Sequence, residues 1–383
     1  MLGRVLRSIF ASRERAQPAA PPAPTPAREP FAAFVTSAEP LRWLDPQDQP
    51  RSLLASTRLR VEIPGRELSA SLRACVLPLD YLLAHPGLEA LGEPVAVVIG
   101  KIASNVLTRR QDAARALLAW VEENAGRMRL LADLSDDLGA MAGPMGEPFL
   151  AEYQAALVRH CELVVPCESL RAQLAPVAAR GIRVIEDPWE SPRSNPPRDA
   201  YGDVPRLLWF GNLMKSNAAA VEAGLVALME RARGRPLALE FVAAAEREAP
   251  LVAPLLAKLV AANPRLSTRF VAWSPEATLR AIDECDLVLL PQDPASAWLS
   301  AKSHNRLVEA IRGGRLAIAS PIPSYRELEG YAWVGDDLSE GLDWALAHPM
   351  EARARVAAGQ AVLDARFSPA AVGAKWRRAL QAA

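Results

Sequence analysis

The stretch from residue 285 to residue 328, CDLVLLPQDPASAWLSAKSHNRLVEAIRGGRLAIASPIPSYREL, decides the fold. It opens with an apolar run, Leu287 to Leu290, which is typical of a buried strand. A polar, turn-rich segment follows, and then a helical pattern from about Lys302 to Ile311, which the pair Gly313-Gly314 ends. Leu316 to Ala319 then supplies a second short strand. Strand, loop, helix and strand form a βαβ unit, which predicts a parallel sheet.

The loop of this unit follows the carboxyl end of its first strand, where open α/β sheets bind their ligands. Cations and small donors at the start of a helix are typical of a phosphate site. Lys302 and Arg306 share one helix face, and Ser303 and Asn305 stand between them as neutral donors. We predict that these four residues bind a phosphate group. A solvated helix start is the alternative.

Glu309 lies one turn beyond Asn305 on the same predicted helix. A carboxylate there can accept hydrogen bonds from both hydroxyls of a ribose. A salt bridge to Arg306 or Lys302 would be the competing role. His304 stands in the first turn, where a lone histidine is more often a hydrogen-bonding neighbour than a catalytic acid or base.

Composition restricts the class of protein. The chain has 383 residues, half of them apolar, which gives room for two globular domains. Because 44 Lys and Arg balance 44 Asp and Glu, no overall basic charge indicates a nucleic-acid partner. The four cysteines show no C-x-x-C spacing and predict reduced, mostly buried thiols of a cytoplasmic protein. No apolar run is long enough to span a membrane.

The N-terminus is organised differently from the rest. Residues 1–16 combine apolar side chains at helical spacing with arginines, so a basic amphipathic helix at the inner face of a membrane is one interpretation. An extension without such a contact is the alternative, which we favour. Proline and alanine dominate residues 17–30, which predict a linker. We expect residues 1–30 as a whole to be disordered.

The remaining chain predicts two doubly wound, Rossmann-like α/β domains with parallel sheets that face each other across a cleft. The predicted first domain is 55–187, a proline-rich linker 188–205 follows, and the second domain is 206–368. A last helix, residues 369–383, is placed where it could cross back to the first domain. The candidate strands of the first domain are Ala74–Leu77, Val95–Ile99, Met128–Ala132, Leu163–Val165 and Ile182–Ile185. Those of the second, beside the two already described, are Arg206–Phe210, Ala238–Val242, Arg269–Val271 and Trp333–Val334.

Three motifs of the second domain follow a known pattern. WFGNLMKSN places Gly211 and Lys215 in a turn after the first strand, and CDLVLLPQ places an aspartate before an apolar strand that ends at proline. LVEAIRGGRLAIASPIPSYRELEG sets Glu309 in a helix before Gly-Gly, a short strand and a further glutamate, Glu327. Together these motifs resemble the C-terminal domain of GT-B glycosyltransferases, in particular family 4 (glycosyl transferases group 1). Asn212 replaces the arginine of the family's first turn.

The resemblance implies a retaining hexosyltransferase that moves a sugar from a nucleotide-sugar donor to a hydroxyl acceptor. The acceptor class it implies is a glycan or glycolipid of bacterial cell-envelope polysaccharide synthesis, with neither a metal nor another cofactor. Within the nucleotide site, Lys215 would act as a point charge beside Gly211, which lets the backbone approach. A base could stack on Trp273, which follows the strand RFVAW.

Two features bear on catalysis. Asp136 and Asp137 follow the strand of RMRLLADLSDD, where a carboxylate could orient an acceptor hydroxyl or take its proton. An aspartate at such a turn also serves as a helix N-cap, which is the alternative.

The family pairs two glutamates; Glu309 matches the second, and Ala301 stands in place of the first. A GT-B-like binding or scaffold protein without catalytic activity is therefore the alternative function.

Overall fold

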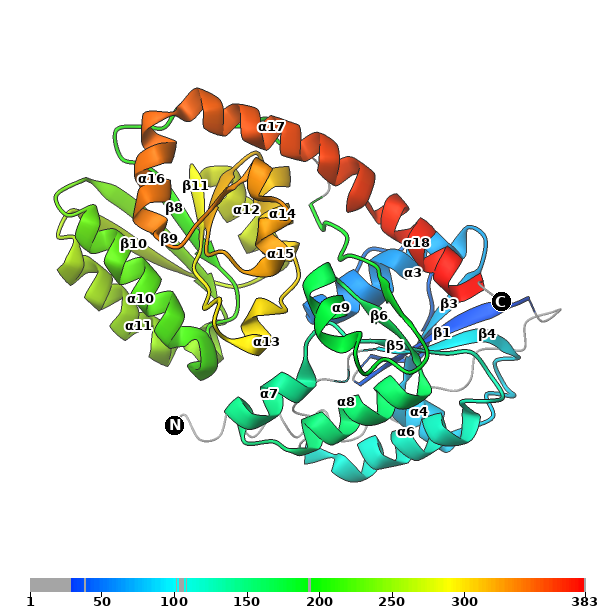
Figure 1. Cartoon of the computed structure of the whole chain (residues 1–383). Coiled ribbons are helices and arrows are strands. Elements are labelled where there is room, and N and C mark those ends of the chain that lie inside the picture. Colours follow the sequence, from blue (N-terminus) through cyan, green and yellow to red (C-terminus); the bar gives the residue numbers. More distant parts are fainter. Residues whose placement is uncertain are drawn as a thin grey trace, which may run out of the picture.

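The computed structural model describes residues 29–37, 39–100, 102, 107, 109–191 and 194–381. These residues form two α/β units, each built on its own sheet, and a long C-terminal helical segment runs from the second unit back to the first (Figure 1). The predicted basic helix of residues 1–16 lies outside the described residues. So does the Pro/Ala linker up to residue 28.

The first sheet has seven strands in the order β2-β3-β1-β4-β5-β6-β7. All of its neighbours pair in parallel except β2, which is antiparallel to β3. The strands are β1 (Phe31–Thr36), β2 (Arg42–Trp43), β3 (Arg73–Pro78), β4 (Pro94–Ile99), β5 (Leu130–Asp133), β6 (Glu162–Val165) and β7 (Ile182–Val184). The helices are α2 (Ala55–Thr57), the π-helix η1 (Arg58–Glu62), α3 (Ile63–Ser69), α4 (Leu79–Ala84), α6 (Gln111–Asn124), α7 (Leu138–Met145), α8 (Phe149–His160) and α9 (Glu168–Leu174).

Strand β1 lies in the middle of this sheet, between β3 and β4, although no strand was predicted there. All six of its residues are buried. Phe31, Ala33 and Val35 pack into the core on one face, whereas Ala32 and Phe34 pack into the core on the other. Because both faces are covered, the strand shows no alternation of polar and apolar residues.

The second sheet has six parallel strands in the order β10-β9-β8-β11-β12-β13. They are β8 (Arg206–Phe210), β9 (Leu237–Ala243), β10 (Leu266–Ala272), β11 (Leu287–Leu290), β12 (Leu316–Ala319) and β13 (Trp333–Val334). The helices are α10 (Lys215–Arg231), α11 (Ala245–Ala262), α12 (Pro275–Glu284), α13 (Ala297–Ser300), α14 (Asn305–Arg312), α15 (Pro323–Arg326), the 3-10 helix η2 (Glu329–Tyr331), α16 (Leu338–Ala347), α17 (Pro349–Arg366) and α18 (Pro369–Gln381).

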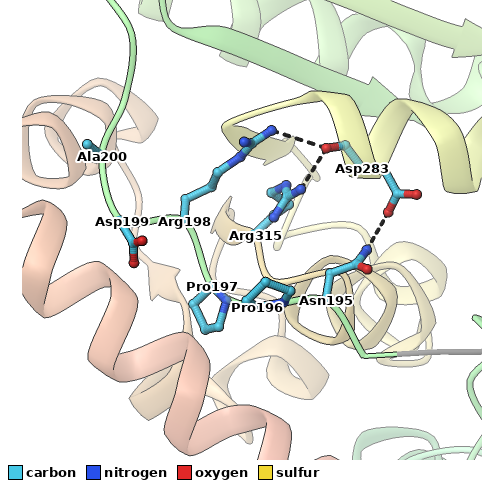
Figure 2. Close-up of a pocket in the computed structure, with 8 residues that line it drawn as sticks. All are labelled: Asn195, Pro196, Pro197, Arg198, Asp199, Ala200, Asp283 and Arg315. Atoms are coloured by element: carbon cyan, nitrogen blue, oxygen red, sulfur yellow. Dashed lines mark hydrogen bonds between the residues drawn. The ribbon is translucent and has the colours of Figure 1, made fainter.

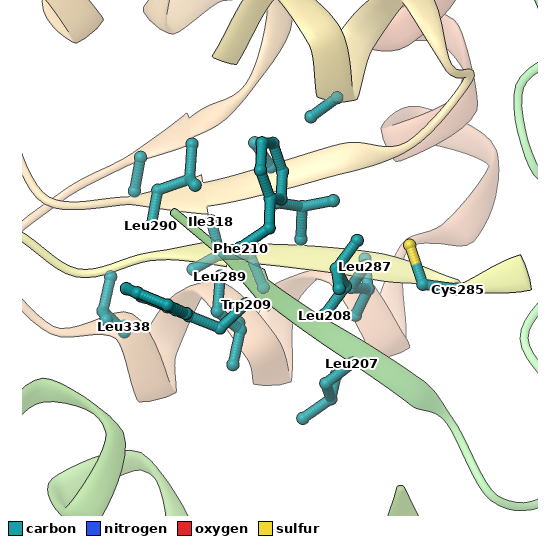
Figure 3. Close-up of a cluster of buried hydrophobic side chains, with 14 of the residues drawn as sticks. Leu207, Leu208, Trp209, Phe210, Cys285, Leu287, Leu289, Leu290, Ile318 and Leu338 are labelled. Atoms are coloured by element: carbon teal, nitrogen blue, oxygen red, sulfur yellow. The ribbon is translucent and has the colours of Figure 1, made fainter. Parts of the chain in front are cut away.

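The core of this unit is centred on β8 and β11 (Figure 3). Trp209 of β8 is fully buried and stacks on Phe241 of β9, with 4.1 Å between the ring centroids.

All four cysteines of the chain are free and buried, as the sequence predicted. None of the helices in the described part of the chain combines the length and the apolar character needed to cross a bilayer.

Strand order fixes where a ligand can bind. In the second sheet the chain proceeds from β8 to β9 and β10 on one side, and then returns to β11 on the other. The carboxyl ends of β8 and β11 therefore flank a topological switch point, which is where doubly wound sheets form their binding crevice. In the first sheet the same change of direction falls between β1 and β4.

Packed aromatic side chains join the units in addition to the linker. Trp376 of α18 is fully buried and meets Phe34 of β1 edge-on, at 5.5 Å between centroids. The short helix α13 lies within a segment predicted to be an irregular loop, and its Trp298 and Leu299 pack into the core of the first unit. Because α13 and a turn take up this segment, α14 starts at Asn305, later than the predicted start at Lys302.

Candidate functional site

The carboxyl end of β8 lies against α14. Gly211 follows β8 with a φ of +147°, a backbone conformation that residues other than glycine rarely adopt. A Cβ atom at this position would lie 3.1 Å from Nη1 of Arg306. The same nitrogen donates to the carbonyl of Phe210 at 3.4 Å. The structure thus brings Gly211 and Arg306, which are distant in sequence, to the switch point of the second sheet.

Helix α10 starts next to this turn with Lys215 as its first residue. The side chain of Lys215 lies outside the described part of the structure. Asn217 holds the turn in place, since its Oδ1 accepts from the Met214 N–H at 2.8 Å and its Nδ2 donates to the Asn212 carbonyl at 2.9 Å. The N-terminus of a 17-residue helix, with its partial positive charge, therefore adjoins Gly211.

Lys302 lies at the interface of the two units. Its ammonium donates to the carboxylate of Asp136 in the first unit, and it lies 4.7 Å from the ring centroid of Trp298. Asp136 follows β5 and is only 5% exposed. Two candidate residues, one predicted on the donor side and one on the acceptor side, are thus in direct contact. The carboxyl edges of the two sheets face each other at this point.

Asp137, by contrast, caps a helix. Its Oδ1 accepts from the Ala140 N–H and from Nε2 of Gln154, both at 3.0 Å. This is the N-cap role that its position between strand and helix allows. The two adjacent aspartates therefore have different surroundings, with Asp136 at the interface and Asp137 at the start of α7.

The start of α14 contains polar groups that are buried. Asn305 has an Nδ2 atom that is buried without a hydrogen-bond partner among the described residues, and Ser303 is half-buried beside it. His304 is buried, with its Nε2 3.1 Å from Oε2 of Glu327. Although burial acts to raise the pKa of Glu327, the contacts with His304 and Arg366 lower it to about 2. His304 thus lies beside a carboxylate of the same unit.

Glu309 faces the linker between the two units. Its Oε1 accepts the backbone N–H of Glu190, and its Oε2 is buried without a hydrogen-bond partner in the described part of the chain. Burial raises the pKa of Glu309 from 4.5 to about 7, despite the N–H groups of Glu190 and Ser191 and the charge of Arg312, which act to lower it. A buried acceptor oxygen on this carboxylate is the kind of group that a ligand hydroxyl can satisfy.

Arg58 is a candidate that sequence reasoning missed. It belongs to η1 of the first unit, donates to both carboxylate oxygens of Glu190, and lies 5.5 Å from the ring of Trp273 beyond β10. A chain of contacts therefore leads from Glu309 through Glu190 and Arg58 to Trp273. The only sequence signal is that the segment RLRVE alternates charged and apolar residues, a pattern expected for an exposed edge. The π-helix instead buries all five, and such helices are frequent at functional sites.

A pocket away from this site lies between the linker and the second unit. It measures about 480 Å³ and is lined by the linker residues 195–200 together with Asp283 and Arg315 (Figure 2). Both Arg315 and Arg198 donate to the Asp283 carbonyl at the end of α12, at 2.7 and 3.1 Å. These arginines satisfy carbonyls that the helix end leaves unpaired. Since the pocket adjoins the amino ends of β11 and β12, it is not the candidate site.

Comparisons with known proteins give matches in structure alone. No protein-family model matches the chain, and no curated protein matches it in sequence. HepE of Anabaena, solved in complex with UDP and glucose, is 12% identical, with a TM-score of 0.65 over 92% of this chain and 100% of that one. WaaG, a glycosyltransferase involved in lipopolysaccharide biosynthesis, is 11% identical, with a TM-score of 0.55 over 92% and 100%. The trehalose-6-phosphate synthase OtsA is 12% identical, with a TM-score of 0.56 over 80% and 75%. The chain therefore has the GT-B fold of these glycosyltransferases.

Proposed function

We propose that the protein is a glycosyltransferase that moves a sugar from a nucleotide-sugar donor to a hydroxyl acceptor. One observation carries the proposal. The switch point of the second sheet combines Gly211, Arg306 and the start of α10, and Lys302 beside it contacts a carboxylate of the first unit. Cationic groups thus adjoin a candidate acceptor group across the interface. Structures of the same fold were solved with UDP-glucose and with UDP and glucose, which supports the same donor class.

The diphosphate of the donor would lie against the Gly211 turn. Arg306 and Lys215 would bind its oxygens, together with Lys302, Ser303 and Asn305 and the N-terminal end of α10. These groups are fixed before the reaction, so they can stabilise the charge that develops on the leaving diphosphate. We propose that this set suffices without a metal ion.

The nucleoside would extend from there toward the linker. We propose that Glu309 accepts the ribose hydroxyls, because its Oε2 is buried at the start of the contact chain that leads to Trp273. The base would then stack on the ring of Trp273, in the place that the guanidinium of Arg58 occupies in this structure. Arg58 would remain close enough to contact the nucleoside from the side of the first unit.

In the transfer step the bond between the anomeric carbon and the diphosphate oxygen breaks, and a bond to the acceptor oxygen forms. Asp136 would orient the acceptor hydroxyl and take its proton as the new bond forms, while the diphosphate leaves with the electron pair of the broken bond. We propose that the anomeric configuration is retained, as the resemblance to family 4 implies. Ala301, at the position of the family's first glutamate, is fully buried in the core of the first unit, so this position offers no group to the sugar.

The raised pKa of Glu309 predicts that nucleotide binding depends on pH. Ribose hydroxyls donate best to the ionised carboxylate, so bound nucleotide should lower the Glu309 pKa from about 7. By linkage, affinity should then rise with pH up to about 7, by at most about tenfold per unit, and level off above it. Titration calorimetry with UDP and GDP between pH 5.5 and 8 measures this. Glu309→Gln should bind more weakly and without the pH dependence. An unchanged slope in that variant would remove Glu309 from the ribose site.

The competing function, a GT-B-like scaffold, predicts a different outcome in one experiment. The purified protein is incubated with a panel of UDP- and GDP-sugars, and free UDP or GDP is quantified over time. A glycosyltransferase releases nucleotide slowly by transfer to water even without its acceptor. Tight nucleotide binding without release from any donor would favour the scaffold.

A further inference from the structure

A small pocket lies at the carboxyl ends of β4 and β5 in the first unit. Its volume is about 10 Å³, and its lining includes Gly100, Asp133, Ser135, Asp136 and Tyr153. A space of this size accepts about one oxygen-sized group. It adjoins the switch point of the first sheet, between β1 and β4, where that sheet is expected to bind its own ligand.

Two hydroxyl groups in this pocket are buried and have no hydrogen-bond partner in the described part of the chain. One is Oη of Tyr153, a residue of α8 that is 1% exposed, and the other is Oγ of Ser135. A buried hydroxyl without a partner costs about 1–3 kcal/mol, and most such groups in native proteins are paired. Two of them in the lining of one small space therefore indicate that an external polar group belongs there.

The surroundings identify the class of that group. Asp136 lines the same pocket, and its carboxylate contacts Lys302 of the donor side. A neutral hydroxyl can donate to this carboxylate and accept from Tyr153 or Ser135 at the same time, whereas an anion would meet the charges of Asp133 and Asp136. The pocket thus suits a hydroxyl better than a carboxylate or a phosphate.

We propose that this pocket receives one hydroxyl of a sugar acceptor, with Tyr153 and Ser135 as its positioning groups. The inference rests on the proposed function and adds to it two residues that position the acceptor. The bound hydroxyl lies next to Asp136, so the acceptor ring would be oriented toward the donor sugar beyond Lys302. A water molecule can take the same place when the acceptor is absent.

Tyr153→Phe tests the proposal because it removes a single oxygen and keeps the buried ring. Acceptor KM is measured by transfer from the cleaved nucleotide-sugar to methyl α-glucoside, methyl α-mannoside and methyl α-galactoside. The variant should raise the acceptor KM about tenfold, and Ser135→Ala should have a similar effect. UDP or GDP affinity should stay the same. The melting temperature should stay nearly the same, since the buried ring is kept.

Tyr81→Phe, in α4 of the same unit, is the matched control and should leave the acceptor KM unchanged. Equal KM values in Tyr153→Phe and the wild type, or donor cleavage without transfer to any of the three glycosides, would overturn the acceptor pocket while the proposed function stands. If the wild type neither binds UDP or GDP nor cleaves a donor, the proposed function fails and the acceptor pocket fails with it.

Discussion

Asp136→Asn should lower the turnover of sugar transfer by about a hundredfold or more, which is the lower range for loss of a positioned acid or base. The substitution keeps the shape of the side chain but removes the charge that would hold the acceptor proton. Nucleotide affinity should change much less, because the donor contacts of Arg306 and Glu309 remain. Steady-state transfer rates and calorimetry with UDP and GDP separate the two effects.

Asp137→Asn is the control for this prediction, because the neighbouring aspartate caps α7. Asparagine is itself a good N-cap, so both turnover and stability should stay close to those of the wild type. Asp137→Ala should cost about 0.5–2 kcal/mol of stability with turnover nearly unchanged. If Asp137→Asn loses as much turnover as Asp136→Asn, the assignment of roles between these two residues is wrong.

Arg60→Met should lower the free energy of unfolding by about 3–5 kcal/mol, the usual cost of removing one partner from a buried ion pair. The guanidinium is 1% exposed, bonds to both oxygens of Asp133 at 3.0 and 3.1 Å through Nε, and donates to Asp187 at 3.2 Å. Methionine keeps much of the volume but leaves two buried carboxylates without this cation. Urea unfolding followed by circular dichroism measures the loss.

Arg127→Met provides the comparison, since its pair with Glu123 is exposed at 73% and 69%. Exposed pairs of this kind contribute about 0.2–1 kcal/mol. Equal stability of the Arg60 and Arg127 variants would mean that the buried network does not hold the first unit to the linker and to α18. That network includes Trp376, whose ring lies 5.5 Å from the Arg60 guanidinium.

The sequence predicted the second sheet closely and the first sheet less well. The bounds of β8, β11, β12 and β13 agree with the predicted strands, because each is a short apolar run that glycine, proline or a charged turn interrupts. Strand β1 follows the Pro/Ala linker, and its sequence FAAFVT has two alanines and no alternation. Nothing local distinguishes it from a continuation of that linker. Its position at the centre of the sheet depends on partners 42 to 64 residues away.

In the candidate site, too, features within one helix could be predicted from the sequence, whereas contacts between residues far apart in the chain could not. Lys302, Arg306 and Glu309 could be proposed from one helix start, because spacing along a helix is a local property. The contact between Lys302 and Asp136 spans 166 residues, and that between Arg58 and Glu190 spans 132. Such contacts depend on how the two units pack, which periodicity and motifs do not encode. The capping of α7 by Asp137 is local, and it was among the alternatives that the sequence offered.

Titration of the protein with UDP and GDP, beside its Arg306→Ala variant, tests the central claim most directly. We expect the wild type to bind one of the two nucleotides and the variant to bind it at least about tenfold more weakly, a loss of about 1.4 kcal/mol. Arg231→Ala, at the exposed end of α10, should bind like the wild type. If the Arg306→Ala variant binds as tightly as the wild type, the diphosphate does not lie at the switch point between β8 and β11.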